Sequence, residues 1–157
     1  MITLNQPRSE LVTVLERHGV TMNQFLGDGF MALVRGAYHA RRAVEAALGS
    51  VQSLAEFNRP RQRLGLALLR ARIGISTGSV FLGNVGTYYK MDFTAVGTTT
   101  NLAARLQSEA EPDFPCLSRT TYEQVHEYVV CKDTTPRPVM LKGLGAHEVW
   151  DVVGARG

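Results

Sequence analysis

The sequence has little of what marks membrane-spanning, secreted or disulfide-stapled proteins. Its longest clearly apolar stretch, residues 64–69, is far shorter than the roughly 20 residues that cross a bilayer. The N-terminus lacks the basic start and the long apolar region of a secretory signal. The two cysteines are too few for a disulfide framework and indicate reduced thiols. We therefore expect a cytoplasmic protein with no membrane span in this chain.

Motifs of several catalytic and binding classes are also missing. No serine or cysteine lies in a nucleophile motif, the Walker phosphate loop is absent, and the histidines have no metal-ligand spacing. A formal net charge of +3 is too small to argue for nucleic acid. The arginines at 59, 61, 63, 70 and 72 could contact phosphate, but no aromatic residues interleave with them as base stacking requires. We expect no nucleic-acid partner, and we interpret these arginines as a solvated linker and strand edge.

What is present fits one globular domain of 157 residues, with 45% hydrophobic and 20% charged residues. Apolar periodicity and capping residues predict helices, the last of them with Ser118 as its N-cap. The predicted helices span residues 10–18, 37–58, 98–109 and 118–125, and residues 59–63 are predicted to be a linker.

Extended apolar segments alternate with these helices. The predicted strands span residues 20–26, 30–35, 68–76, 80–85, 88–96, 139–142 and 148–153. The first two form a hairpin around Gly27-Asp28-Gly29, a strong turn signal. The interleaving predicts an α+β fold (an α/β sandwich), and the adjacent hairpins favour a mixed, mainly antiparallel sheet flanked by helices.

Several polar residues allow both a structural and a chemical interpretation. Asp28 can close a turn, or it can hold a cation at the mouth of a sheet. Asn101 and Arg105 are four residues apart, which places them on one helical face, either as a solvated pair or as part of a site. Lys142 precedes a Gly-x-Gly turn, where an exposed lysine is common.

Four sequence blocks, in order, resemble the class III nucleotide cyclase catalytic domain: FLGDGFMALV, RIGISTGSVFLGNVG, MDFTAVGTTTNLAARL and LKGLG. The third block is the most specific, because residues 93–105 fit the family pattern aromatic-Thr-x-x-Gly-x-x-x-Asn-x-Ala-x-Arg. The resemblance runs from about residue 10 to residue 153 and implies a single cyclase homology domain over residues 1–157, N-terminally short. It also implies a ferredoxin-like fold derived from βαββαβ.

The resemblance implies an enzyme that converts ATP, or less often GTP, to the 3′,5′-cyclic nucleotide and pyrophosphate, for use in intracellular signalling. Active sites of the family lie at the interface of a head-to-tail homodimer, where two aspartates hold two Mg²⁺ or Mn²⁺ ions. Asp28 matches one of these metal ligands. Gly27 and Gly29 flank it and allow the nucleotide to approach the backbone closely.

The resemblance also assigns roles to the three other polar residues. Arg105 matches the residue that stabilises the transition-state phosphate, a task that suits guanidinium geometry. Asn101 matches the residue that orients the ribose, and Lys142 the one that reaches the terminal phosphates.

Two departures from the family pattern stand out. The second metal aspartate belongs to the family's first, central strand, whereas residues 1–9 (MITLNQPRS) contain no acidic residue. The first strand and its metal ligand are therefore expected to be missing, leaving exposed strand edges or a groove that invites pairing with another chain. The second departure is Gln24, which stands where adenine-selective cyclases often carry lysine. Thr94, the partner position, fits adenine, so ATP is expected as substrate and GTP stays possible.

Two functions therefore stay open. The first is a homodimeric adenylate cyclase, for which an aromatic patch would supply part of the partner surface. The patch comprises Tyr88, Tyr89, Met91 and Phe93. The second is a degenerate cyclase homology domain that binds a nucleotide or pairs with another cyclase chain without turnover of its own.

Overall fold

The computed structural model describes the backbone of residues 2–3, 8–26, 29–79, 81–84, 93–96 and 98–156. Side chains are described for residues 13–20, 31–79 and 98–156.

The helices form where apolar periodicity predicts them, and one of them runs further. Their bounds are α1 (Arg8–Arg17), α2 (His39–Arg63), α3 (Thr98–Glu109) and α4 (Arg119–Val125). Ser118 caps α4 as predicted, because its side chain accepts a hydrogen bond from the Thr121 amide. The prediction of a linker at residues 59–63 is wrong, because α2 continues through Pro60 to Arg63.

The strands of the described residues belong to three sheets. The first has the order β1 (Ile2–Thr3), β3 (Gly29–Leu33), β2 (Thr21–Leu26). The second has the order β4 (Gly74–Ile75), β7 (Cys116–Leu117), β10 (Gly145–Ala155), β8 (Val129–Cys131), with β9 (Arg137–Leu141) also paired to β10. The third consists of β5 (Phe81–Asn84) and β6 (Phe93–Val96). The α+β class and the mixed, mainly antiparallel pairing are confirmed, since β4–β7 is the one parallel pair among the described strands.

One predicted strand needs correction, and three short strands were not predicted. The predicted strand at residues 68–76 is reduced to Gly74–Ile75, because the Leu69 backbone bonds the Asn58 side chain instead of a neighbouring strand. The short strands β7 and β8 were not predicted, since their pairing with β10 defines them. A two-residue strand, β1, precedes α1 where no strand was predicted. Its β-branched residues suit the open edge of β3, and it carries no carboxylate.

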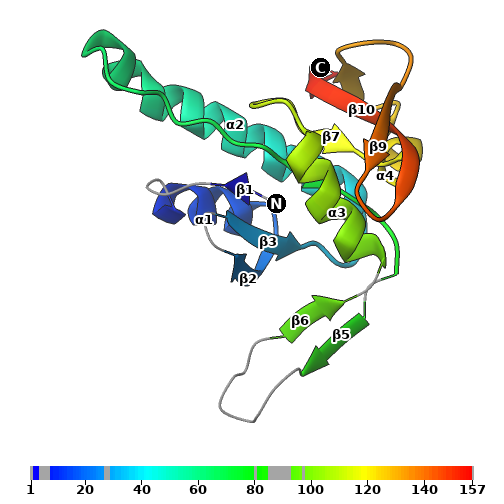
Figure 1. Ribbon diagram of the computed structural model, residues 1–157. Coiled ribbons are helices and arrows are strands. Elements are labelled where there is room, and N and C mark those ends of the chain that lie inside the picture. Colours follow the sequence, from blue (N-terminus) through cyan, green and yellow to red (C-terminus); the bar gives the residue numbers. More distant parts are fainter. Residues whose placement is uncertain are drawn as a thin grey trace.

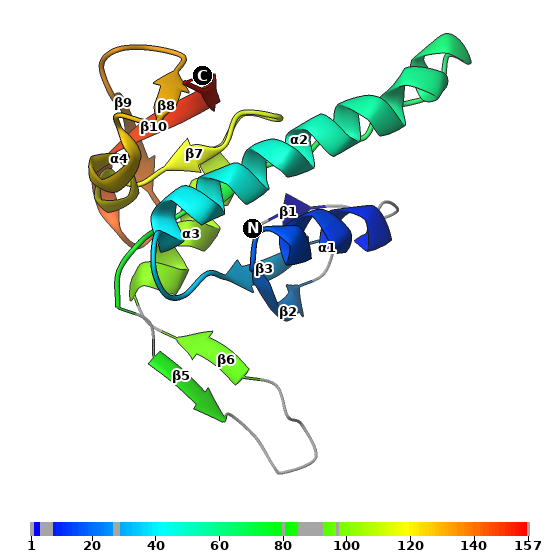
Figure 2. The same ribbon diagram turned by 180° about the vertical axis from the view of Figure 1, so that it is seen from behind.

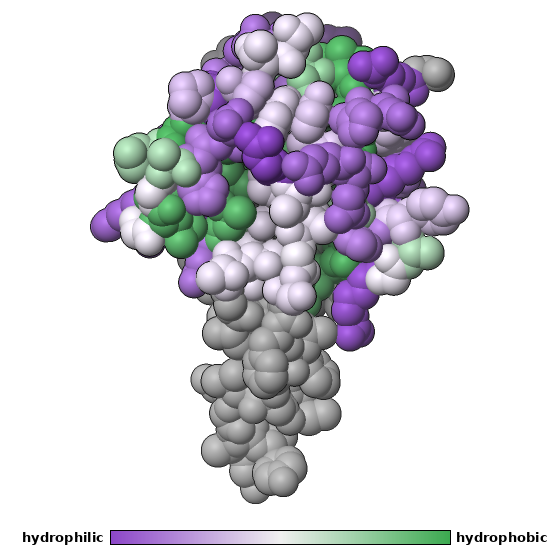
Figure 3. Space-filling view, turned by 90° about the vertical axis from the view of Figure 1, so that its right-hand side faces the viewer, coloured by the Kyte–Doolittle hydropathy of each residue, from purple (hydrophilic) through white to green (hydrophobic). Residues whose placement is uncertain are grey.

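Helix α2 divides the molecule (Figures 1 and 2). Helix α1 and the β1–β3–β2 sheet lie along one side of α2, and the β10 sheet with α4 lies along the other. The β5–β6 hairpin lies beyond the N-terminal end of α3, where its strand β6 approaches β2 of the first sheet. The face shown in Figure 3 is mostly hydrophilic, with hydrophobic residues in small separate groups over its described part.

The core follows from this division, because α2 contributes to two hydrophobic clusters. Leu54 packs in one cluster with α1 and with Ile73, and Val44 packs in another with Leu117 and Trp150 of the large sheet. Leu106 of α3 anchors a third cluster on β9 and β10. Alanine and serine on the buried face of α2 allow the flanking elements to approach closely.

Helix α3 sits unusually close to β4. A Cβ atom on Gly74 would lie 2.5 Å from the Ala103 carbonyl oxygen and 2.8 Å from the Leu106 Cβ, and closer still to the Gln107 nitrogen. Two of these three atoms belong to the helix backbone, which cannot rotate away as a side chain would. Only glycine at this position allows α3 to sit where it does.

We expect Gly74→Ala to lower the free energy of unfolding by about 1–3 kcal/mol, the usual cost of overpacking a well-filled site. Gly154→Ala is the matched control, because Gly154 lies in β10 with nothing within 4 Å of its Cβ position. It should change stability by less than about 0.5 kcal/mol. Urea unfolding followed by circular dichroism measures both values, and equal stabilities of the two variants would contradict the close packing of α3 on β4.

Candidate active site

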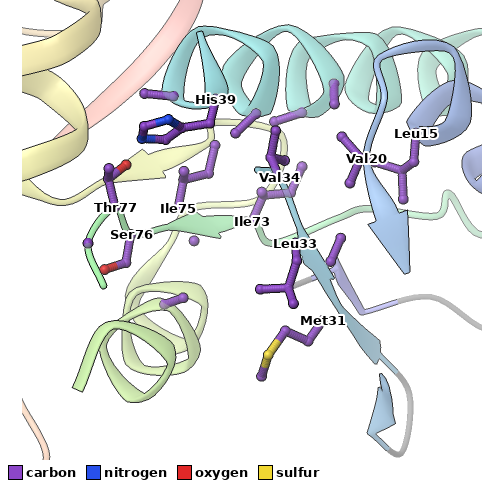
Figure 4. A pocket seen from close by; sticks show the side chains of 18 of the residues that line it. Leu15, Val20, Met31, Leu33, Val34, His39, Ile73, Ile75, Ser76 and Thr77 are labelled. Carbon is purple, nitrogen blue, oxygen red and sulfur yellow. The ribbon is translucent and has the colours of Figure 1, made fainter. Parts of the chain in front are cut away.

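A cavity of about 150 Å³ lies between β3 and β4, beneath α2 (Figure 4). Its walls are mostly apolar side chains from β3 and β4 and the residues next to them, together with alanines of α2 and α3. Leu33 and Val34 face Ile73 and Ile75 across it, and Ala103 and Ala104 of α3 close the other side. The cavity therefore separates the two larger sheets at their facing strands.

Strand pairing along this cavity is incomplete. Strand β2 covers one edge of β3, whereas β1 covers only Gly29 and Phe30 on the other edge. On that second edge, Met31 and Leu33 have no strand partner among the described residues. The position corresponds to the groove that the sequence predicts for a missing central strand, and edges of this kind accept an additional strand.

The polar end of the cavity is formed by the segment after β4. Thr77 bonds away from the cavity, with its Oγ1 2.7 Å from the Thr121 Oγ1. Ser76 is different, because its buried Oγ has no hydrogen-bond partner in the described structure. A buried hydroxyl without a partner costs about 1–3 kcal/mol. Ser76 is therefore available to a polar group of a bound molecule or segment. The sequence contained a signal for it, the RIGISTG block, but gave it no role.

Helix α3 presents a different face to each of its surroundings. Leu102 and Leu106 pack toward β9 and β10, and Ala103 and Ala104 line the cavity. Asn101 and Arg105 are both exposed, and their spacing of four places them on one face of the helix. This polar pair therefore stands on the surface beside the cavity.

The start of α3 is fixed by the segment after β4. The Thr99 hydroxyl donates to the Ser79 carbonyl oxygen at 2.9 Å, and the same hydroxyl would lie 2.6 Å from a Cβ on Gly78. This contact and the one at Gly74 set the orientation of the whole helix. They therefore set the direction of Asn101 and Arg105.

Lys142 lies in the turn between β9 and β10 and is exposed, as predicted. The Leu144 amide donates to the Leu141 carbonyl oxygen at 3.0 Å, and Gly143 and Gly145 take positive φ angles of 78° and 81°. Leu144 and Leu102 of α3 pack against the same cluster. The fold thus brings the Lys142 turn and the helix that carries Asn101 and Arg105 to the same part of the molecule.

The base-recognition candidates lie on two adjacent strands. Gln24 pairs with Met31 in the β2–β3 hairpin, next to a register shift. Thr94 pairs with Gly83 in the β5–β6 hairpin, and β2 and β6 approach each other. This arrangement brings the backbones of the two predicted strands close together, while the side chains of Gln24 and Thr94 lie outside the described set.

The predicted metal site falls largely outside the described residues. Gly27 and Asp28 are not described, and Gly29 is described by its backbone as the first residue of β3. Within the described part of the chain, no group of three His, Cys, Asp or Glu residues could hold a metal ion. The described residues alone therefore do not form a two-metal site. Tyr88, Tyr89 and Met91 of the aromatic patch are not described, nor is the side chain of Phe93.

The most perturbed titratable group is remote from this cavity. Burial, and to a smaller extent the Asp151 carboxylate, raises the pKa of the Cys116 thiol to about 12, while Arg137 opposes the effect. Arg137 donates to both carboxylate oxygens of buried Asp151, at 2.9 and 3.0 Å. Cys116 therefore stays protonated at neutral pH, which excludes it as a nucleophile. Burial also raises the pKa of Cys131.

Comparison with known proteins agrees with this arrangement. The family model for the adenylate and guanylate cyclase catalytic domain matches residues 1–153. The crystal structure of the guanylyl cyclase Cya2 superposes with a TM-score of 0.84 at 31% identity, covering 94% of this chain and 77% of that one. The adenylyl cyclase CyaB from P. aeruginosa gives a TM-score of 0.81 at 26% identity, covering 95% and 79%.

Curated relatives include both substrate classes. Adenylate cyclase 1 of Rhizobium meliloti is 37% identical over 98 residues, which are 60% of this chain and 15% of that protein. Receptor-type guanylate cyclase gcy-4 of Caenorhabditis briggsae is 29% identical over 161 residues, 96% of this chain and 14% of that protein. The chain thus spans about one-seventh of these relatives. It belongs to the family of adenylate and guanylate cyclase catalytic domains. No described helix is long and apolar enough to cross a membrane.

Proposed function

We propose that this chain is the catalytic domain of a homodimeric adenylate cyclase that converts ATP to 3′,5′-cyclic AMP and pyrophosphate. One observation carries the proposal. Helix α3, fixed on β4 at Gly74, holds Asn101 and Arg105 exposed together, and the turn of Lys142 packs on the same cluster as α3. These groups suit a nucleoside triphosphate. The cationic side chains of Arg105 and Lys142 match its phosphates, and the Asn101 amide matches its ribose hydroxyls.

The chemistry follows from these groups. The ribose 3′-oxygen attacks the α-phosphorus and loses its proton, and the bond from the α-phosphorus to the bridging oxygen breaks to release pyrophosphate. Negative charge grows on the phosphoryl oxygens and on the leaving group. Arg105 stabilises the first charge, Lys142 the second, and Asn101 orients the ribose for in-line attack. Bound Mg²⁺ or Mn²⁺ would lower the pKa of the attacking hydroxyl, with Asp28 as a ligand by family resemblance.

We expect Arg105→Ala to lower kcat about tenfold to a thousandfold and to change KM much less, because the contact strengthens in the transition state. Arg17→Ala, which removes an exposed arginine from α1, is the control and should leave both constants unchanged. Steady-state cyclic-nucleotide production measures the effect in the form of the protein that turns over. Unchanged turnover in a folded Arg105→Ala variant would make Arg105 an ordinary surface residue.

Base choice provides the second test. We expect a weak preference for ATP over GTP, because Thr94 can bond a purine edge while the Gln24 amide can present its donor or its acceptor. Gln24→Lys should strengthen the preference for ATP. Parallel titrations with both nucleotides measure the ratio of the kcat/KM values. If GTP reacts at least as well as ATP, the adenylate assignment is wrong.

The third test concerns the cavity and the missing carboxylate. We expect residues 1–157 alone to have weak or no activity, since one aspartate does not fix two metal ions. Adding an upstream strand that ends in Phe-x-Asp should restore turnover with Mn²⁺ by filling the space between β3 and β4. Robust turnover by the short chain would show that another acid supplies the ligand.

In either form, Asp28→Ala should abolish Mn²⁺-dependent nucleotide binding, measured by calorimetry, without changing the circular dichroism spectrum. Sedimentation of the same samples reports on self-association. A chain that stays monomeric at high concentration, with and without nucleotide, would contradict a preformed homodimer.

A second function has its own support. The cavity between β3 and β4 and the unpaired edge of β3 beside it support a degenerate domain that pairs with another cyclase chain. Nucleotide binding without turnover, in both the short and the extended forms, would favour this alternative.

A further inference from the structure

The far end of α2 forms a basic, apolar tip, which we define as residues 57–72. In both views of the ribbon, this end of α2 extends away from the two sheets (Figures 1 and 2). The last buried residue of α2 is Leu54, so the final turns of the helix contribute no buried side chain to the core. The helical part of the tip, residues 57–63, thus lies beyond the buried face of α2, and the chain returns to the core at Leu69 and Ala71.

Three leucines are exposed on this tip. Their exposed fractions are 74% for Leu64, 49% for Leu66 and 38% for Leu68. Other exposed large hydrophobic residues of the described chain, such as Met140, are scattered rather than grouped within five positions. Grouped exposed hydrophobic residues mark an interaction surface more often than single ones do.

The leucines are held in place by an ordered turn. The Leu66 amide donates to the Arg61 carbonyl oxygen at 2.8 Å and the Gly65 amide to that of Gln62 at 3.2 Å, the bonding pattern of a Schellman motif. Gly65 has a φ of 70°, as this motif requires. The following segment is tied back by two hydrogen bonds between Asn58 and the Leu69 backbone, at 2.7 and 2.9 Å. The exposure of the leucines is therefore a property of a fixed conformation.

The charge of the tip has one sign. It contains the five arginines at 59, 61, 63, 70 and 72 and no acidic residue. Because the whole chain has a formal net charge of +3, the remaining residues are net acidic. Arg59, Arg63 and Arg72 are exposed, and Arg70 is 58% exposed even though it pairs with Asp113 at 3.3 Å. The exposed leucines are thus flanked in the chain by arginines, three of which, at 59, 61 and 63, lie on the helix directly before Leu64.

We propose that the tip of α2 is a docking site for the surface of an anionic lipid bilayer. Leucines inserted at the interface and arginines at the level of the phosphate groups are the combination that binds such surfaces. A protein partner fits less well, because a stable protein interface needs about 800 Å² from each side and this tip is narrow. The proposed cyclase activity is not required for this contact. Docking would place α2, which also lines the cavity, against the bilayer.

Vesicle co-sedimentation of the 157-residue chain tests the proposal. We expect binding to vesicles of phosphatidylcholine with 30% phosphatidylserine, little binding to pure phosphatidylcholine, and loss of binding as salt rises. Leu64→Ser/Leu66→Ser should weaken binding at least about tenfold, since it removes the inserted apolar surface. Arg63→Gln should weaken binding about fivefold, the effect of one basic residue near an anionic surface.

Matched controls separate the tip from general surface effects. Met140→Ser/Val130→Ser removes two exposed hydrophobic residues of the large sheet, and Arg17→Gln removes an exposed arginine of α1. Both should bind as the unaltered chain does. Circular dichroism confirms that every variant is folded.

Four outcomes would overturn the proposal. The first is no binding of the unaltered chain to anionic vesicles, and the second is equal binding by the Leu64→Ser/Leu66→Ser variant. The third is leucine-dependent binding to soluble polyglutamate as tight as to vesicles, which would point to an acidic protein. Displacement by millimolar glycerophosphoserine would likewise show a headgroup pocket instead of a bilayer surface. None of these outcomes bears on turnover, so the test is independent of the proposed catalysis.

Discussion

The position of α3 on β4 is the constraint on which the candidate site depends. Gly74 has no side chain, so the backbone at Ala103 and Gln107 lies directly against the strand. With the helix fixed, its leucines face the large sheet, its alanines face the cavity and its polar pair faces solvent. A methyl group at position 74 would push α3 away from β4. Because the helix moves as a rigid body, its contacts with the large sheet, with the cavity and with solvent would all shift together.

Helix α2 has the complementary role. Its small buried residues allow one element to pack against α1 and the β3 sheet on one side and against the large sheet on the other. Because no strand pairing joins the two larger sheets within the described chain, the helices hold them around the cavity. This explains how the family fold persists, at a TM-score of 0.84 to a solved cyclase, although β3 and β4 are not joined by a strand between them.

The same helix connects the two functional regions that we propose. Its 25 residues rise by roughly 1.5 Å each, so the cavity at its N-terminal half and the basic tip at its other end are fixed relative to each other. A contact at the tip would orient the domain without touching the nucleotide site.

The sequence by itself determined the elements whose signals are local. The bounds of α3, the β2–β3 hairpin and the Ser118 cap follow from periodicity, turn residues and capping chemistry, and the spacing of Asn101 and Arg105 predicted their shared face. The motif order gave the family, which the comparisons confirm.

Only the tertiary structure decided the rest, because it depends on contacts between distant residues. Asn58 holds Leu69 and turns a predicted strand into a return segment, and α2 continues through Pro60. Ser76 loses its hydrogen-bond partners through burial, which no local pattern reports. Of the exposed leucines after α2, only Leu68 fell in a predicted strand, and Leu64 and Leu66 were assigned to no element. They are exposed because α2 is longer than the sheets that it packs against and therefore extends past the core.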